Sequence, residues 1–146
     1  MAGVVVGIDG SPQAEAALAF ALEEAKLRNL PLRLVCAWEI PVIEYTDAVF
    51  RSAPDLSAEA EREAHQVLAE ALEVIGDQPG IAIESVAVSG HPPDVLAEQS
   101  IGATLLVVGS RGHGGFASLV LGSVSQSTAH RSSVPLVIVL SPASAR

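Results

Sequence analysis

The amino-acid sequence predicts an α/β fold, an open parallel sheet with helices on both faces. Short runs of valine, leucine and isoleucine alternate along the chain with longer segments rich in alanine and glutamate. Strands that are buried on both faces have such continuous apolar runs, and successive parallel strands need a helix between them. The length of 146 residues fits a single domain, residues 1–146, with a sizeable core.

The first half of the chain begins with a strand, a helix and a second strand. Gly3–Asp9 (GVVVGID) has the pattern of a buried strand. The helix after it begins at Ser11, a suitable N-cap, and Pro12 fits its first position. Leu30–Trp38 is the second expected strand. Residues Glu39–Asp55 contain two prolines, and we expect a loop or a broken element there.

A second helix is expected from Leu56 to Gly76. Alanine and glutamate dominate this segment, Ser57 can cap it, and the glycine can end it. In the segment before it, Tyr45 and Phe50 either pack against the sheet or gate a pocket. Packing is favoured, because aromatic residues are only 3% of the chain and are usually buried.

The second half of the chain alternates in the same way. Gly80–Gly90 is an alternating strand, and Ala103–Ser110 and Val134–Leu140 are apolar strands. Pro92–Gly102, which two prolines open, and Gly122–Ser132 are the expected helices. The last six residues are expected to fray.

Composition excludes several classes of partner. The formal net charge is −9 and the eight basic residues are scattered, which argues against a nucleic-acid or anionic membrane partner. Cys36 is the only cysteine, so no intrachain disulfide is expected and a reducing, cytoplasmic setting is favoured. The N-terminus lacks a signal-peptide pattern, and no apolar run approaches the ~20 residues of a membrane helix.

Glycine and serine are concentrated directly after the fourth expected strand, in VVGSRGHGGFASLVLGSVS, Val107–Ser125. In open parallel sheets, ligands bind beyond the carboxyl ends of the strands, where the chain order reverses. The connectivity brings Asp9–Ser11, Ala37 and the chain from Gly109 onward to that edge. This convergence predicts a ligand site there.

Several catalytic motifs are absent. A Walker A loop needs a lysine after its last glycine, and Lys26, the only lysine, lies in the first helix. The nucleophile motif G-x-S-x-G is missing, and the four histidines have no close metal-ligand spacing, so no catalytic residue and no metal ligand are assigned. A phosphate cradle remains, built from N–H groups of the glycine turn and of the following helix. Ser123 and Ser125 could donate to phosphate oxygens there, or Ser123 could simply cap the helix.

The spacing Gly109-x-x-Gly112, nine residues, Gly122-Ser123 resembles the nucleotide-binding motif of the universal stress protein family. The segments VVVGIDGS, VVGSRGHGG and SSVPLVIV are similar to that family as well, and the resemblance covers nearly the whole chain. It implies a Rossmann-like five-stranded parallel sheet of order 3-2-1-4-5. It also implies membership of the branch that binds ATP, and frequent homodimers through the last strand.

The resemblance implies a nucleotide contact for each motif position. Asp9 would lie near the ribose and adenine, Gly7 where the chain passes the nucleotide, and Ala37 at the adenine edge. Val108 and Gly109 would contact the ribose side. The triphosphate cradle would be formed by Gly112, Gly122, Ser123, Val124 and Ser125.

Two of the expected contacts have structural alternatives. Asp9 could instead form an Asx turn with Ser11. Arg111 could pair with a phosphate, or it and His113 could be solvated loop residues, an alternative that is favoured for His113.

The sequence thus predicts an ATP-binding regulatory protein, holding ATP with Mg²⁺, whose nucleotide state changes its conformation, dimerisation or binding to an unidentified protein partner. One alternative is a slow ATPase or phosphotransferase, in which Asp9 helps to hold Mg²⁺. Another is a scaffold homodimer, independent of nucleotide, that pairs through the C-terminal strand.

Overall fold

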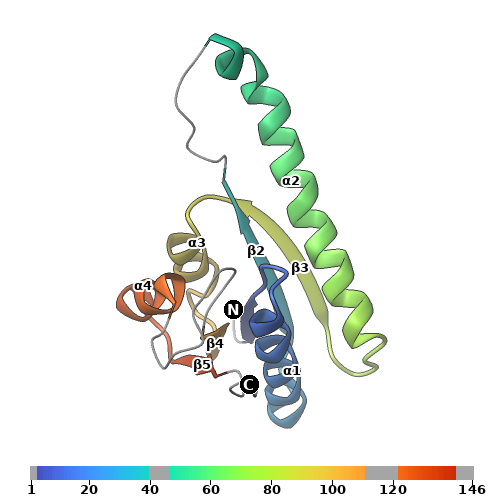
Figure 1. The fold of residues 1–146 in the computed structure, drawn as a ribbon. Coiled ribbons are helices and arrows are strands. Elements are labelled where there is room, and N and C mark those ends of the chain that lie inside the picture. The colour runs from blue at the N-terminus through green and yellow to red at the C-terminus, as the bar shows by residue number, and fades with distance from the viewer. Residues whose placement is uncertain (1–2, 40–46, 111–121, 141–146) are drawn as a thin grey trace, which may run out of the picture.

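The computed structural model describes residues 3–39, 47–110 and 122–140, with residues 47–55 described by their backbone alone. Arg111, Gly112, His113 and Tyr45 lie outside the described residues, as do the side chain of Phe50 and the last six residues. Strands and helices alternate along the chain (Figure 1). The elements are β1 (Val4–Gly7), α1 (Pro12–Arg28), β2 (Leu32–Trp38), α2 (Asp47–Ile75), β3 (Ile83–Ser89), α3 (Pro92–Gln99), β4 (Leu105–Gly109), α4 (Ser123–Arg131) and β5 (Leu136–Val139).

The strands form one parallel sheet of order β3-β2-β1-β4-β5, which confirms the expected fold class and strand order. Val4 of β1 aligns with Leu32 of β2 on one side and with Leu105 of β4 on the other. The chain order reverses between β1 and β4: from β1 the chain adds β2 and β3 on one side, and it then returns to add β4 and β5 on the other side. The carboxyl ends of β1, β2 and β4 therefore border one crevice.

Two helices cover each face of the sheet. On one face, α1 and α2 pack over β1, β2, β3 and β4, and their buried alanines and leucines meet the side chains of Val4, Val6 and Leu34. On the other face, α3 packs against β2 and α4, around Val5, Val35 and other valines and leucines. Among the described residues, no helix is long and apolar enough to cross a membrane.

The start of α1 confirms the expected cap. Ser11 has extended backbone, and its Oγ accepts a hydrogen bond from the N–H of Ala14 at 3.1 Å, while Pro12 occupies the first helical position. β1 ends two residues earlier than expected, because Asp9 enters a turn with Ser11 in place of extending the strand.

The predicted start of the second helix is wrong. The helix α2 begins at Asp47, so that part of the segment expected to be a loop is helical, and Ser57 lies inside the helix and does not cap it. Pro54 lies within this helix and does not break it. Proline loses one backbone hydrogen bond, but its fixed φ is close to the helical value, and the strong helix formers after it favour extension. The predicted end is confirmed: Gly76 follows the last turn with φ +64°.

Candidate functional site

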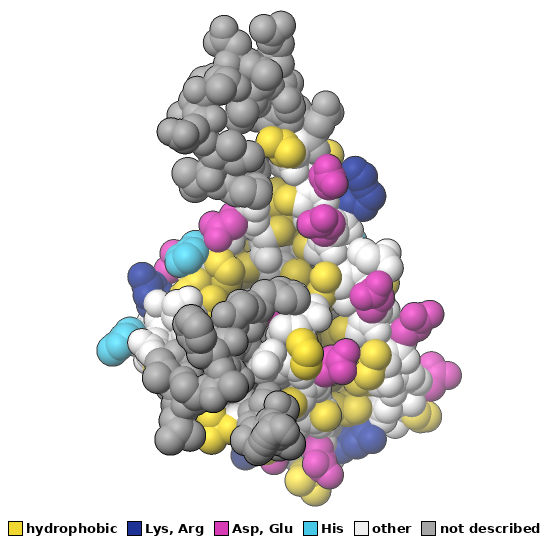
Figure 2. All heavy atoms as spheres, in the orientation of Figure 1, with side chains coloured by type: hydrophobic (Ala, Val, Ile, Leu, Met, Phe, Trp, Pro, Cys, Tyr) yellow, Lys and Arg dark blue, Asp and Glu magenta, His cyan; other side chains and the backbone are white. Residues whose placement is uncertain are grey.

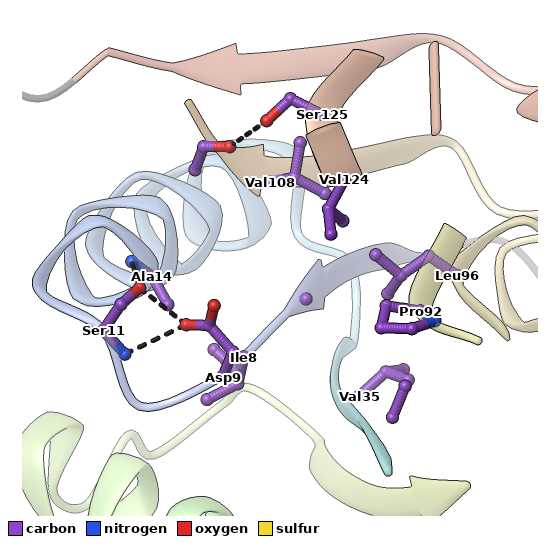
Figure 3. Close-up of a pocket in the computed structure, with 13 residues that line it drawn as sticks. Ile8, Asp9, Ser11, Ala14, Val35, Pro92, Leu96, Val108, Val124 and Ser125 are labelled. Atoms are coloured by element: carbon purple, nitrogen blue, oxygen red, sulfur yellow. Dashed lines mark hydrogen bonds between the residues drawn. The ribbon is translucent and has the colours of Figure 1, made fainter. Parts of the chain in front are cut away.

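A cleft lies at the carboxyl edge of the sheet, between the ends of β1, β2 and β4 and the first turns of α1, α3 and α4 (Figure 3). It encloses about 550 Å³ of empty space, counting its open mouth. The described residues that line it are Gly7, Ile8, Asp9, Ser11, Ala14, Val35, Ala37, Pro92, Leu96, Val108, Gly109, Val124 and Ser125.

One side of the cleft is an apolar slot. Val35 of β2, Leu96 of α3 and Val108 of β4 line it (Figure 3), and Ala37 of β2 lines it as well. Asp9 is the only charged residue among those described as lining the cleft. A flat apolar ring fits such a slot better than a charged group does, because a charge would lose its hydration there.

The turn between β1 and α1 forms the opposite side. Asp9 Oδ1 accepts hydrogen bonds from the backbone N–H of Ser11 at 2.9 Å and from its Oγ at 2.6 Å. This is the Asx turn that the sequence allowed as the structural alternative for Asp9. Gly10 between them has φ +85°, a conformation that favours glycine. The turn presents the Asp9 carboxylate at the cleft and is fixed to the first turn of α1 through Ser11.

The N-terminus of α4 also opens at the cleft. Its N-cap is Gly122, which offers no side-chain cap, so the suggestion that Ser123 caps the helix is wrong. The N–H groups of a helix's first turn have no partner within the helix, and they carry its positive dipole end. Val124 and Ser125 of this turn line the cleft. This arrangement of N–H groups is the one that favours a bound anion.

Hydrogen bonds fix α4 against the end of β4. The Oγ of Ser125, whose residue is 1% exposed, lies 2.6 Å from the carbonyl oxygen of Gly109 and 2.9 Å from that of Ser110. The N–H of Gly122 donates to the same Ser110 oxygen at 2.7 Å. The first turn of α4 is therefore held at a set distance from β4. In this structure the Ser125 hydroxyl serves that contact.

Gly109 is required by packing, whether or not a ligand binds. A Cβ at this position would lie 2.8 Å from the carbonyl oxygen of Gln13 and 2.9 Å from its carbonyl carbon. These are backbone atoms of α1, which cannot move aside as a flexible side chain could. The first glycine of the motif thus allows the first turn of α1 to approach the end of β4.

The structure brings most of the predicted site residues together. Those that line the cleft are Gly7, Asp9, Ala37, Val108, Gly109, Val124 and Ser125. Gly122 and Ser123 stand at the start of α4 but do not line it, and Ser123 is exposed. Arg111 and Gly112 lie outside the described residues, so their predicted contacts stay predictions.

Sequence reasoning placed Ser11 at this edge without assigning it a ligand contact, and it missed five other lining residues. They are Ile8, Ala14, Val35, Pro92 and Leu96. The connectivity contained a signal for the last two. A helix that follows a parallel strand begins at the carboxyl edge, so the first turn of α3 had to border the same crevice as those of α1 and α4.

Next to the cleft, Cys36 of β2 is 5% exposed. Burial raises the pKa of its thiol from 9.0 to about 11, and the nearby Asp9 carboxylate adds to the rise. The thiol is therefore neutral at physiological pH and is a weak nucleophile. Among the described residues, no three His, Cys, Asp or Glu side chains gather as a metal site would require.

The sheet order and the site together define an open parallel α/β protein with a ligand cleft where the strand order reverses. The family model of the universal stress protein family matches residues 2–139, and the chain belongs to that family. The universal stress protein Rv2005c of Mycobacterium tuberculosis is 37% identical over 139 residues, which cover 94% of this chain and 45% of that protein. The chain thus spans about half the length of the curated relatives it matches.

Solved structures share the fold. The universal stress protein UspA of Lactobacillus plantarum superposes with a TM-score of 0.81 over 94% of this chain and 97% of that one, at 15% identity. A universal stress protein solved in complex with cAMP is 30% identical, covers 96% of this chain and 97% of its own, and has a TM-score of 0.59.

Proposed function

We propose that this chain is an ATP-binding regulatory protein, and that ATP with Mg²⁺ in the cleft changes its conformation, dimerisation or binding to a protein partner. One observation carries the proposal: the first turn of α4, without a side-chain cap, opens on a cleft whose other side is an apolar slot. An adenine nucleotide has the same two parts, an apolar ring and an anionic tail. The 30% identical relative with bound cAMP supports an adenine nucleotide as the ligand.

The chemistry of the walls suggests how the nucleotide lies. The adenine ring would enter the slot between Ala37 and Leu96, and the ribose would lie near Asp9 and Gly109. The phosphates would accept hydrogen bonds from N–H groups at the start of α4. Gly122 and Ser123, which stand at the start of α4, would then contact the phosphates, and the predicted contacts of Arg111 and Gly112 would lie on the same side.

A carboxylate is in place for Mg²⁺. Mg²⁺ commonly binds through one or two carboxylates together with substrate phosphates. Asp9 is the only carboxylate among the described lining residues, so the phosphates would hold most of the metal's coordination. When bound, Mg²⁺ neutralises part of the phosphate charge. A regulatory role is favoured over hydrolysis, because no other described lining residue can act as a general base.

Titration calorimetry with ATP and Mg²⁺ tests the proposal, using wild type, Ala37→Leu and Ala129→Leu. Ala37 lines the slot, so the larger side chain should fill part of the adenine position and weaken binding at least tenfold. Ala129 is exposed on α4 and does not line the cleft, so the same substitution there should change the dissociation constant less than twofold.

Two results would contradict the proposal. Absence of binding heat together with absence of a thermal shift would exclude ATP as a ligand, because ligand at ~100 times its dissociation constant stabilises a fold by ~2.7 kcal/mol. Tighter binding of AMP or cAMP than of ATP would keep the cleft as the site but replace its ligand. Chromatography of nucleotide released from freshly denatured protein identifies any ligand that survives purification.

Homodimerisation through the last strand belongs to the same proposal. β5 is an edge strand of the sheet, each of its four residues is half-buried, and the adjoining Leu140 is 69% exposed. An uncovered apolar edge supports pairing with a second copy. Light scattering should give twice the chain mass of 15.0 kDa, and a monomer at all concentrations would refute the pairing.

A further inference from the structure

A second hollow lies on the other side of the β1–α1 turn, between α1 and α2. It encloses about 350 Å³ of empty space, counting its open side. We refer to it as the α1–α2 groove. The described residues that line it are Ile8, Gly10, Ser11, Ala14, Glu15, Leu18, Val67, Glu70, Ala71 and Val74.

The groove has an apolar floor and an acidic rim. Ala14 and Leu18 of α1 are buried at its base, and Val74 of α2 stands at its opening with 65% of its surface exposed. Glu15 of α1 and Glu70 of α2 are both exposed on its edges. In Figure 2, hydrophobic side chains on this face are bordered by acidic ones.

The surroundings of the groove are acidic as well. Residues 56–75 of α2 carry one arginine, Arg62, against five glutamates at positions 59, 61, 63, 70 and 73. Among the residues that the structure describes, no lysine or arginine lines the groove. Glu70 accepts a hydrogen bond from Gln66 Nε2 at 2.9 Å, a neutral partner that leaves its charge uncompensated. A positive potential on a partner would complement this rim.

We propose that the α1–α2 groove docks a short amphipathic segment of a partner protein, whose apolar side chains enter the groove and whose lysines or arginines face Glu15 and Glu70. This inference names the surface and the chemistry of the partner that the proposed regulatory function requires. The apolar floor attracts segments with apolar side chains. The acidic rim favours those segments that also carry lysine or arginine.

The test uses a synthetic helical peptide with leucines at every third or fourth position and lysines beside them, and a second peptide with glutamate in place of lysine. Fluorescence anisotropy measures both against the full chain without nucleotide. We expect the lysine peptide to bind and the glutamate peptide to bind at least tenfold more weakly. Because the measurement needs no ATP, it remains informative if the nucleotide proposal fails.

Matched variants locate the binding. Glu70 lines the groove, whereas Glu73 is exposed on the same helix and does not line it. Glu70→Lys and Glu73→Lys change the net charge equally, but we expect only Glu70→Lys to weaken the lysine peptide tenfold or more. Val74→Ser should weaken it at least threefold, and Leu27→Ser, at an exposed leucine of α1 outside the groove, should leave it unchanged.

Three results would overturn the inference. Equal weakening by Glu70→Lys and Glu73→Lys would mean diffuse attraction to an acidic protein. Equal binding of the two peptides would remove the role of the rim. A dimer in light scattering that Glu70→Lys or Val74→Ser converts to monomer would show that a second copy of this chain occupies the groove.

Discussion

The buried hydroxyl of Ser125 donates a hydrogen bond to the protein's own backbone at the edge of the candidate site. The Oγ lies 2.6 Å from the Gly109 carbonyl oxygen and so sets the position of the α4 N–H groups that the proposed phosphate site needs. Ser125→Ala would leave that carbonyl without this partner, at a cost of about 1–3 kcal/mol in stability. It would also free the first turn of α4 to shift.

The consequence for binding should depend on phosphate. We expect Ser125→Ala to weaken ATP about tenfold and adenosine less than twofold, since only ATP would use the α4 N–H groups. Calorimetry with both ligands measures the difference, with Ser133→Ala, at an exposed serine after α4, as the control. Equal weakening of adenosine and ATP would mean that Ser125 acts only through general stability.

Cys36 should make the free energy of unfolding depend on pH. Its folded pKa of about 11 lies above the 9.0 of an unperturbed thiol, so between these values the folded state keeps a proton that the unfolded state loses. Its contribution to stability is therefore fully present below pH ~9 and falls as the pH rises toward ~11. Urea unfolding at pH ~9 and at pH ~11 measures this contribution. Between the two pH values, the free energy of unfolding should fall more for wild type than for Cys36→Ala. Equal slopes for the two proteins would contradict the raised pKa.

At the scale of elements, two serines that are both predicted to cap a helix have different surroundings. Ser11 is buried and caps α1, whereas Ser57 lies inside α2. Ser11→Ala should lower the free energy of unfolding by about 0.5–2 kcal/mol, because the Ala14 N–H loses its acceptor. Ser57→Ala should change it by less than about 0.5 kcal/mol, since alanine is the better residue within a helix. Urea denaturation checks both, and a loss at Ser57 as large as at Ser11 would contradict the assignment.

Elements were predictable from the sequence where one signal dominated. The apolar run of β4 and the cap of α1 fix their elements locally, and both predictions are confirmed. The start of α2 was missed because Pro54 and the helix formers after it give opposite signals. A local sequence pattern does not show whether the cost of a proline outweighs the helix propensity of its neighbours.

At the scale of the whole molecule, connectivity predicted where the site lies but only part of what forms it. Strands alternating with helices were enough to bring Asp9, Ala37 and Gly109 to one edge, whereas the strand order came from the family resemblance. The contact between Gly109 and the Gln13 backbone was not predictable, because it depends on how closely α1 approaches β4. The sequence shows a glycine at position 109, and the close approach of the Gln13 backbone explains why a larger residue does not fit there.

The cleft and the α1–α2 groove share a wall, and this gives the molecule a route between nucleotide and partner. Ile8, Ser11 and Ala14 line both hollows. A ligand in one hollow contacts residues that a ligand in the other hollow contacts as well, so we expect the two to bind with positive cooperativity. We expect saturating ATP to tighten the lysine peptide about fivefold, a coupling of about 1 kcal/mol.

Reciprocity makes this prediction strict, because the peptide must then tighten ATP by the same factor. Paired titrations measure each ligand with and without the other. Glu70→Lys, which lines only the groove, should abolish the effect of the peptide on ATP while leaving the affinity for ATP itself unchanged. If both ligands bind but neither affinity changes, the shared wall does not couple the two hollows. ATP must then act on partners through another surface, such as the β5 edge.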